Sequence, residues 1–220
     1  MCPHGVIEVR RFISCRTPRI LDVGCGNHSP KNTKRYLPRC EYHGVDIRRM
    51  NRDAEDDRCM DRFFDVDLNF PAQLAVIPDG SYDVVICSHV LEHLDKPYVV
   101  AGKLAEKVNV GGMLFFEVPS VRSLRLPRAA DGWLGVRGCL NFFDDDTHKT
   151  LVDIDDVAEV VVLKGLTVRR VGPRRLWRRV FLLPLYVAAC VAVKGFVPAS
   201  VLWDVMGFAR ILVAVRETAV

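Results

Sequence analysis

Short apolar runs, each followed by glycine, aspartate or proline, recur along most of the chain. Their length and their content of valine, isoleucine, leucine and phenylalanine are typical of strands buried on both faces of a parallel sheet. The pattern predicts strands at residues 19–24, 41–47, 62–66, 82–88, 112–118, 166–171 and 209–217. Helical stretches separate several of these runs, which predicts an α/β fold with helices on both faces of the sheet.

Two helices are predicted between these strands. Residues 97–108 carry apolar side chains at helical spacing, with Pro97 in a favourable first turn. Gly111 and Gly112 follow this helix and are expected to end it. Residues 153–163 show a second helical pattern.

The predicted elements group into one domain with two added segments. Residues 1–171 and 209–220 contain all the predicted strands and form the domain. Residues 121–150 begin with a long connection after the fifth strand, and such connections in compact domains are usually functional or mobile. We therefore expect a substrate lid there. Residues 172–208 form an insertion between the sixth and seventh strands.

The composition is that of a globular protein in a reducing compartment. Of the 220 residues, 50% are hydrophobic and 26% are charged. The cysteines include no C-x-x-C pair and no cysteine–histidine spacing typical of zinc sites, so we expect free thiols and no bound metal. The amino-terminal stretch lacks the apolar core of a secretory signal, which predicts a cytoplasmic protein.

The end of the first strand carries the first candidate chemistry. Gly24 and Gly26 permit a tight turn and a close approach of the backbone to a ligand. Ser29 stands where the dinucleotide fingerprint has its third glycine, so that fingerprint is incomplete. Asp22 lies just before the glycines, where a carboxylate would repel a pyrophosphate but attract a ligand bearing an ammonium and a sulfonium.

Polar residues also follow the next three strands. Asp46 ends the second strand, where a carboxylate can accept hydrogen bonds from both hydroxyls of a ribose. Asp67 follows the third strand and could reach an adenine amine. Ser88 and His89 follow the fourth strand. Ligands of open α/β sheets bind at the edge where these strands end.

The order of these motifs resembles that of the class I S-adenosylmethionine-dependent methyltransferases. The matching stretches are D-x-G-x-G, G-x-D, D-L-N-x-P, DGSYDVVICSHVLEHL and GGMLFFEVP. Within that class the chain is similar to the small-molecule group that includes the ubiquinone-type O-methyltransferases, well over residues 18–120 and more loosely over 141–171. The resemblance implies a Rossmann-like sheet of seven strands, in which the last strand is antiparallel and lies between the fifth and sixth.

The resemblance also implies S-adenosylmethionine as cofactor and S-adenosylhomocysteine as product. The expected cofactor-binding residues are Asp22, Gly24 and Gly26 at the methionine end, Asp46 at the ribose, Ile47, Asp67 and Leu68 at the adenine, and Ser88 and His89 near the methionine moiety. Taken singly, each has a plainer interpretation as a turn glycine or a helix cap. Together, in this order, they favour the cofactor site.

Methyl transfer to a hydroxyl requires a base, and two histidines are candidates. His93 follows the fourth strand and could be catalytic or structural. His148 lies in NFFDDDTHKT beyond the fifth strand, in a loop expected over the cofactor. Asp145 and its neighbours could orient an imidazole, hold a divalent cation or form a solvated turn. We predict His148 as the general base, steadied by Asp145.

The expected acceptor is a small or lipid-linked molecule, methylated at a hydroxyl oxygen. The stretch CSHV after the fourth strand lacks the (D/N)-P-P-(Y/F) motif of amino-group methylation on adenine or glutamine. The arginine-rich stretch lacks interleaved aromatic residues that stack on bases, so no nucleic-acid partner is expected. The alternative function is a non-catalytic scaffold or sensor that binds S-adenosylmethionine.

The insertion begins with clustered arginines and continues into an apolar run. The formal net charge is +4, and six arginines stand close together, at positions Arg169, Arg170, Arg174, Arg175, Arg178 and Arg179. They predict a local basic patch that attracts anionic surfaces. A membrane-spanning helix requires about 20 apolar residues, and Pro184 and Lys194 interrupt this run too early, so no span is expected.

Two alternatives remain for the insertion. A buried helical hairpin would enlarge the core or form the face of a homodimer. A hairpin of residues 174–203 on a membrane surface would use the arginines and two flanking tryptophans, Trp177 and Trp203, as interfacial anchors. It would make the protein peripheral on the inner face of a membrane. The length of the apolar run favours the buried hairpin.

Overall fold

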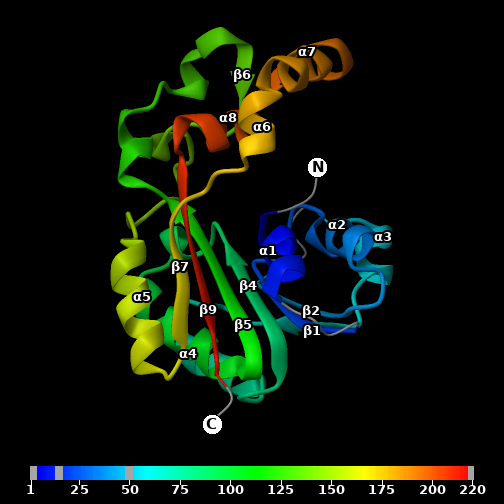
Figure 1. The fold of residues 1–220 in the computed structure, drawn as a ribbon, viewed down its shortest axis with the longest axis vertical. Coiled ribbons are helices and arrows are strands. Elements are labelled where there is room, and N and C mark those ends of the chain that lie inside the picture. Colours follow the sequence, from blue (N-terminus) through cyan, green and yellow to red (C-terminus); the bar gives the residue numbers. More distant parts are fainter. Residues whose placement is uncertain (1–3, 13–16, 48–51, 218–220) are drawn as a thin grey trace.

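The computed structural model describes residues 4–12, 17–47 and 52–217, and a seven-stranded sheet forms its centre (Figure 1). The sheet strands are β1 Arg19–Val23, β2 Glu41–Asp46, β3 Arg62–Asp65, β4 Tyr82–Ser88, β5 Val108–Pro119, β7 Thr167–Pro173 and β9 Ala209–Val215. Their order is β3-β2-β1-β4-β5-β9-β7. Strand β9 is antiparallel to both neighbours, β5 and β7, which confirms the expected mixed sheet.

Helices cover both faces of this sheet. The α-helices are α1 His4–Phe12, α2 Ser29–Tyr36, α3 Ala54–Arg58, α4 Pro97–Lys107, α5 Ile154–Leu163, α6 Trp177–Phe181, α7 Leu183–Lys194 and α8 Ala199–Met206. Leu104 of α4 and Val157 of α5 belong to the buried cluster on one face, and Val9 of α1 belongs to the cluster on the other. Helix α1 was not among the predicted elements.

The start of β5 differs from the prediction. Helix α4 ends at Lys107, as expected, but β5 begins at once at Val108. Gly111 and Gly112 therefore lie inside the strand and do not end the helix. The pairing of β5 with β4 shifts its register in this stretch, and Gly111 adopts a φ of 80° there. A glycine tolerates such an irregularity because it has no Cβ atom.

The lid segment and the insertion pack together at the carboxyl edge of the sheet (Figure 1). We call these two segments, residues 121–150 and 172–208, the cap. The lid consists of the short 3-10 helices η3 Val121–Arg125, η4 Ala129–Asp131, η5 Trp133–Gly135 and η6 Phe142–Asp144, together with strand β6 Val136–Arg137. Strand β6 pairs in parallel with β8 Val197–Pro198 of the insertion. One buried cluster contains Leu140 of the lid and Val201 of α8.

Helix α7 lies on the outer surface of the cap, and none of its residues is buried. One side of the helix packs against the rest of the cap, through Leu183, Tyr186, Val187 and Cys190. Helix α7 therefore does not enlarge the core of this chain, and the alternative of a homodimer face stays a prediction. None of the helices in the described part of the chain combines the length and the apolar character that a bilayer crossing requires.

Candidate active site

The turn after β1 brings the backbone into the site. Gly24 has a φ of 73°, and a Cβ atom there would lie 2.3 Å from Cγ2 of Val90. The N–H of Gly24 donates to the carbonyl of Val45 at 2.8 Å, and the N–H of Gly26 donates to Asp46 Oδ2 at 3.1 Å. The turn thus fixes the carboxylate at the end of β2, and position 24 has no room for a Cβ atom because Val90 packs against it.

A first cavity of about 440 Å³ opens beside this turn. It is lined by predicted site residues, namely Gly24, Gly26, Asp46, Ile47, Asp67, Leu68, His89 and His93. Ile47 is 49% exposed, which suits a side chain that would lie against a flat ring. One carboxylate oxygen of Asp67 accepts the N–H of Asn69 at 2.9 Å. The volume is within the range of small-molecule sites.

A second cavity of about 360 Å³ adjoins the first and shares Gly24, Gly26 and His89 with it. Asp22 and Ser88 line this cavity, so the two cavities together are lined by every residue predicted to bind the cofactor. The lining residues that were not predicted as site residues include Gly5 and Val6 of α1 and Trp203 of α8.

Asp22 is a buried carboxylate at the wall of the second cavity. It accepts hydrogen bonds from the hydroxyls of Ser29 and Tyr42. Burial raises the pKa of Asp22 to about 6 in spite of these hydrogen bonds, because the charged form loses its hydration. A cationic group in the cavity would offset this loss. The site therefore fits the ammonium group of S-adenosylmethionine.

His89 lies between two buried glutamates at the boundary of the cavities. Its Nδ1 is 3.1 Å from Glu92 Oε1, and its Nε2 is 3.1 Å from Glu117 Oε1. Burial alone would lower the pKa of His89, but the hydrogen bonds and charges of Glu117 and Glu92 outweigh it and raise the pKa to about 9. At neutral pH His89 is therefore a cation, which cannot serve as a general base.

The charge network continues from Glu117 into the cap. Arg174 Nη1 lies 2.7 Å from Glu117 Oε1, and Arg174 Nε lies 3.7 Å from Asp204 Oδ1. Arg179 Nη1 lies 3.1 Å from Asp204 Oδ2. Burial would raise the pKa of Glu117, but the charges of Arg174 and His89 lower it well below its usual range. All these side chains are buried except that of His89, and they join the sheet to helices α6 and α8.

The clustered arginines do not form one basic surface, so that prediction is wrong for most of the cluster. Arg174 and Arg179 are buried in the network. Arg169 and Arg170 each form an ion pair with a glutamate. Arg178 is exposed and Arg175 is half-exposed.

The second candidate for catalysis comes from the loop before α5. The N–H groups of Lys149 and Thr150 donate to the carbonyl of Glu92 at 2.8 and 3.1 Å. This pairing holds the loop against the 3-10 helix η2 Leu91–His93, and the ring centroids of His93 and His148 are 4.8 Å apart. The structure thus brings the two histidines together, although they are distant in the sequence.

The protonation of His148 is fixed by its neighbour. Its Nδ1 lies 2.7 Å from the carbonyl oxygen of Phe142, and a carbonyl only accepts, so Nδ1 carries the proton. The lone pair of Nε2 can then accept a proton. Asp145 Oδ2 is 3.9 Å from Nε2, too far for a hydrogen bond, and its other oxygen is held by Thr147. The hydrogen bond that orients the imidazole thus comes from the carbonyl of Phe142, and Asp145 contributes only a nearby charge.

The catalytic candidates differ in their access to the cavities. His93 and Thr147 line the first cavity, and the Thr147 hydroxyl lies 2.9 Å from His93 Nδ1. His148 lies directly behind them and lines neither of the two cavities, while Asp145 faces a separate pocket of the lid.

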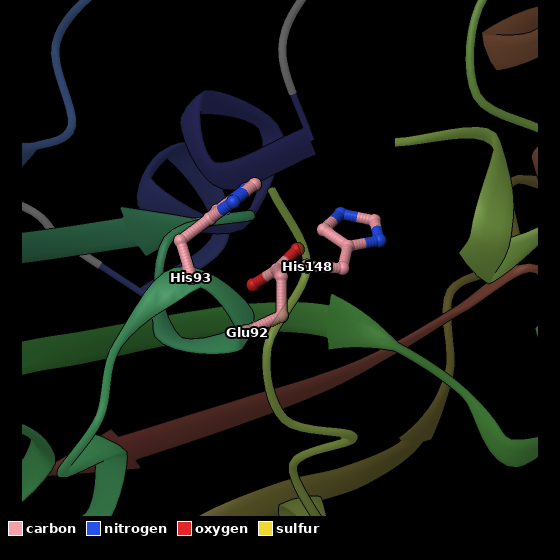
Figure 2. A group of neighbouring side chains, drawn as sticks. All are labelled: Glu92, His93 and His148. Carbon is pink, nitrogen blue, oxygen red and sulfur yellow. The ribbon is translucent and has the colours of Figure 1, made fainter. Parts of the chain in front are cut away.

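Figure 2 shows the carboxylate of Glu92 between the rings of His93 and His148. Each residue offers one ligand atom, and these atoms lie within 4.8 Å of one another. Glu92 Oε2 is buried without a hydrogen-bond partner among the described residues. A carboxylate with two imidazoles is a donor set that divalent transition metals accept, so the group could hold a cation, although no metal is predicted from the sequence.

Two site residues were misread or missed in the sequence. Only the membrane-surface alternative gave Trp203 a role, as an anchor, but its ring centroid lies 4.7 Å from that of His89, and its Nε1 donates to the carbonyl of Cys139. Glu117 was read only as part of an apolar strand. Its signal was available, because a single carboxylate inside the run GMLFFEV must find a buried partner.

Residues 8–168 match the family model described as a methyltransferase domain. A ubiquinone biosynthesis O-methyltransferase of Burkholderia vietnamiensis is 27% identical over 168 residues, which cover 71% of this chain and 71% of that protein. Relatives of the same name in other Burkholderia species are 30% identical over 44% of this chain and 43% of their own length.

Solved structures with the same fold span almost the whole chain. An S-adenosylmethionine-dependent methyltransferase from Archaeoglobus fulgidus aligns with a TM-score of 0.56 and 19% identity, covering 95% of this chain and 91% of that one. A phosphoethanolamine N-methyltransferase of Haemonchus contortus, solved with S-adenosylhomocysteine, aligns with a TM-score of 0.63 and 13% identity. That alignment covers 97% of this chain and 52% of the other.

Proposed function

Because this chain belongs to the S-adenosylmethionine-dependent methyltransferases, we propose that it methylates a hydroxyl oxygen of a small or lipid-linked acceptor, with His148 as the general base. The observation that carries the proposal is the hydrogen bond between His148 Nδ1 and the carbonyl of Phe142. It leaves Nε2 as a proton acceptor next to the residues that line the first cavity. His89 is excluded from this role by its charge at neutral pH.

The cofactor, when bound, supplies an electrophilic methyl group on a sulfonium. Asp22 would pair with its ammonium group, and Asp46 would accept hydrogen bonds from the ribose hydroxyls. Ile47 and Leu68 would lie against the adenine, with Asp67 at its amine. Ser88 and His89 would lie along the methionine portion, where the two cavities meet.

The cap would enclose the acceptor beside the methyl group. Thr147 from the lid and Trp203 from the insertion border the two cavities on either side of His89. An acceptor held there would present its hydroxyl in line with the bond that breaks, and positioning supplies most of the acceleration of such displacements. His148 Nε2 would take the hydroxyl proton as the new oxygen–carbon bond forms, and the electron pair of the broken bond would stay on sulfur.

Transfer of a labelled methyl group from S-adenosylmethionine to an acceptor tests the proposal. Cell extract is separated into aqueous and organic fractions, and each is incubated with the protein and S-adenosylmethionine labelled in the methyl group. Label in the organic phase identifies a lipid-linked acceptor, and label in the aqueous phase identifies a soluble one. Binding of the cofactor without transfer to any fraction would contradict the proposal.

The role of His148 is then tested on the acceptor found. His148→Ala should lower kcat by about 10²- to 10⁴-fold, the usual contribution of a general base. Its affinity for S-adenosylhomocysteine should stay unchanged, and added imidazole should restore part of the activity. His93→Gln is the matched variant, since it alters the neighbouring ring without removing the base. A His148→Ala protein with native turnover would refute this assignment.

A further inference from the structure

Helices α6 and α7 expose an apolar surface that the fold does not use. Its side chains are Trp177, Phe181, Leu182, Leu185, Val191 and Val193, which we call the hairpin patch. Phe181 is 75% exposed and Val193 is 83% exposed. Figure 1 shows α7 projecting from the cap, away from the sheet. Exposed apolar surface concentrated on one element usually marks a binding surface for a membrane or another protein.

The patch is held in place by the rest of the insertion. The opposite side of α7 packs on the cap, and Arg179 of α6 is anchored to the buried Asp204 of α8. The outward side chains are therefore not unpacked members of the core. They face outward because the inner side of the helix already completes the apolar cluster of the cap.

The charges of the segment that carries the patch are all of one sign. Residues 174–203 contain no aspartate or glutamate. Arg178 and Lys194 are exposed, and Arg175 is half-exposed and lies 5.2 Å from the ring of Trp177. An apolar surface on a segment whose exposed charges are all basic complements an anionic bilayer. A symmetric dimer through the same patch would bring identical positive charges together, which is unfavourable.

We infer that the hairpin patch docks the protein on the surface of an anionic lipid bilayer. Helix α7 has 12 residues and is about 18 Å long at 1.5 Å per residue, so it lies in the interfacial region and does not cross the roughly 30 Å hydrocarbon layer. Trp177 lies at the level of the headgroups, where indole rings are favoured. This inference goes beyond methyl transfer, because docking requires no turnover.

The test is co-sedimentation of the purified protein with vesicles. Vesicles of phosphatidylcholine alone are compared with vesicles of phosphatidylcholine and phosphatidylglycerol, at low and at moderate salt. The native protein should sediment with the anionic vesicles, and less so as salt rises, because salt screens the surface potential. Arg175→Gln/Arg178→Gln should lower the partition coefficient about 30-fold, since each basic residue near the surface contributes roughly a factor of five.

Two further variants make the test specific. Phe181→Ser/Leu185→Ser removes exposed apolar side chains without changing charge, and it should lose binding even at low salt. Arg35→Gln/Arg39→Gln removes the same charge from exposed arginines outside the cap and should lose much less. Unchanged affinity for S-adenosylhomocysteine shows that each variant is folded and separates this test from that of the enzymatic activity.

Three results would overturn the inference. The native protein could stay in the supernatant with anionic vesicles at low salt. The two hairpin variants could sediment as well as the native protein does. Sedimentation velocity could show a native dimer that Phe181→Ser/Leu185→Ser dissociates while vesicle binding is unchanged, which would make the patch a dimer face.

Discussion

Replacing Asp22 by asparagine should make the protein more stable and, at the same time, unable to hold its cofactor. Asparagine keeps an oxygen that accepts hydrogen bonds from Ser29 and Tyr42, but it carries no charge. The ionised carboxylate is the unfavourable form in the folded state, since burial raises its pKa from 3.8 to about 6. The substitution removes that cost at neutral pH.

The sign and size follow from the two pKa values. A carboxyl whose pKa is higher in the folded than in the unfolded state costs nothing below the unfolded value, and its cost grows as pH rises through the folded value. With 3.8 and about 6, the cost is about 1 kcal/mol at pH 4.5 and about 3 kcal/mol at pH 7.5. The stability gained by Asp22→Asn should therefore grow by about 2 kcal/mol across this interval.

Urea unfolding of both proteins at the two pH values measures this growth. Asp65→Asn, an exposed carboxylate on β3, is the matched control for the loss of one charge. Isothermal titration with S-adenosylhomocysteine measures the second effect, a loss of affinity from the missing partner of the ammonium group. The reasoning would fail if the stability difference did not change with pH, or if the variant bound the ligand as tightly as the native protein.

Two other substitutions test the glycine turn and the charge network. Gly24→Ala should destabilise the protein by about 1–3 kcal/mol, because of the positive φ and the contact with Val90, and it should weaken cofactor binding. Gly80→Ala is the matched control, because Gly80 has a similar φ but open space around it. Glu117→Gln should cost about 3–5 kcal/mol, because it removes the nearer carboxylate of the buried Arg174 and leaves only the longer contact with Asp204. The raised pKa of His89 stabilises the native protein below about pH 6.5, and this stabilisation is lost as pH rises to about 9. The free energy of unfolding, measured with urea across that range, should therefore fall less in Glu117→Gln than in the native protein. These expectations would be contradicted if Gly24→Ala and Gly80→Ala lowered the free energy of unfolding equally. They would also be contradicted if this free energy fell equally with pH in Glu117→Gln and in the native protein.

The sheet was predictable because its strands are locally distinct. Residues 19–24 and 82–88 were predicted as strands from apolar runs alone, and they became β1 and β4 with boundaries within a residue. Helix α1 was not predicted because its buried apolar side chains, Val6 and Val9, stand beside polar residues that are also buried, His4 and Glu8. Its burial depends on the space between the sheet and α2, and no local pattern records that space.

The cofactor residues were predictable for a different reason. Asp22, Gly24 and Asp46 lie at or just beyond the carboxyl ends of β1 and β2, which meet at one edge, so their order along the chain already implies proximity. The orientation of His148 was not predictable in this way. Its partner is a backbone carbonyl, that of Phe142, and the sequence carries no mark of which carbonyl will face an imidazole.

The arginines show where reasoning from composition fails. Arg178 and Arg179 are neighbours of one type, yet one is exposed and the other is buried against Asp204. The difference follows from helical geometry, because adjacent residues on a helix point about 100° apart and only one of them can face α8. A buried arginine is tolerated only with a carboxylate beside it, and Asp204, at the end of the stretch without acidic residues, supplies it. The acidic residue that closes a basic segment is thus the signal that part of the segment faces inward.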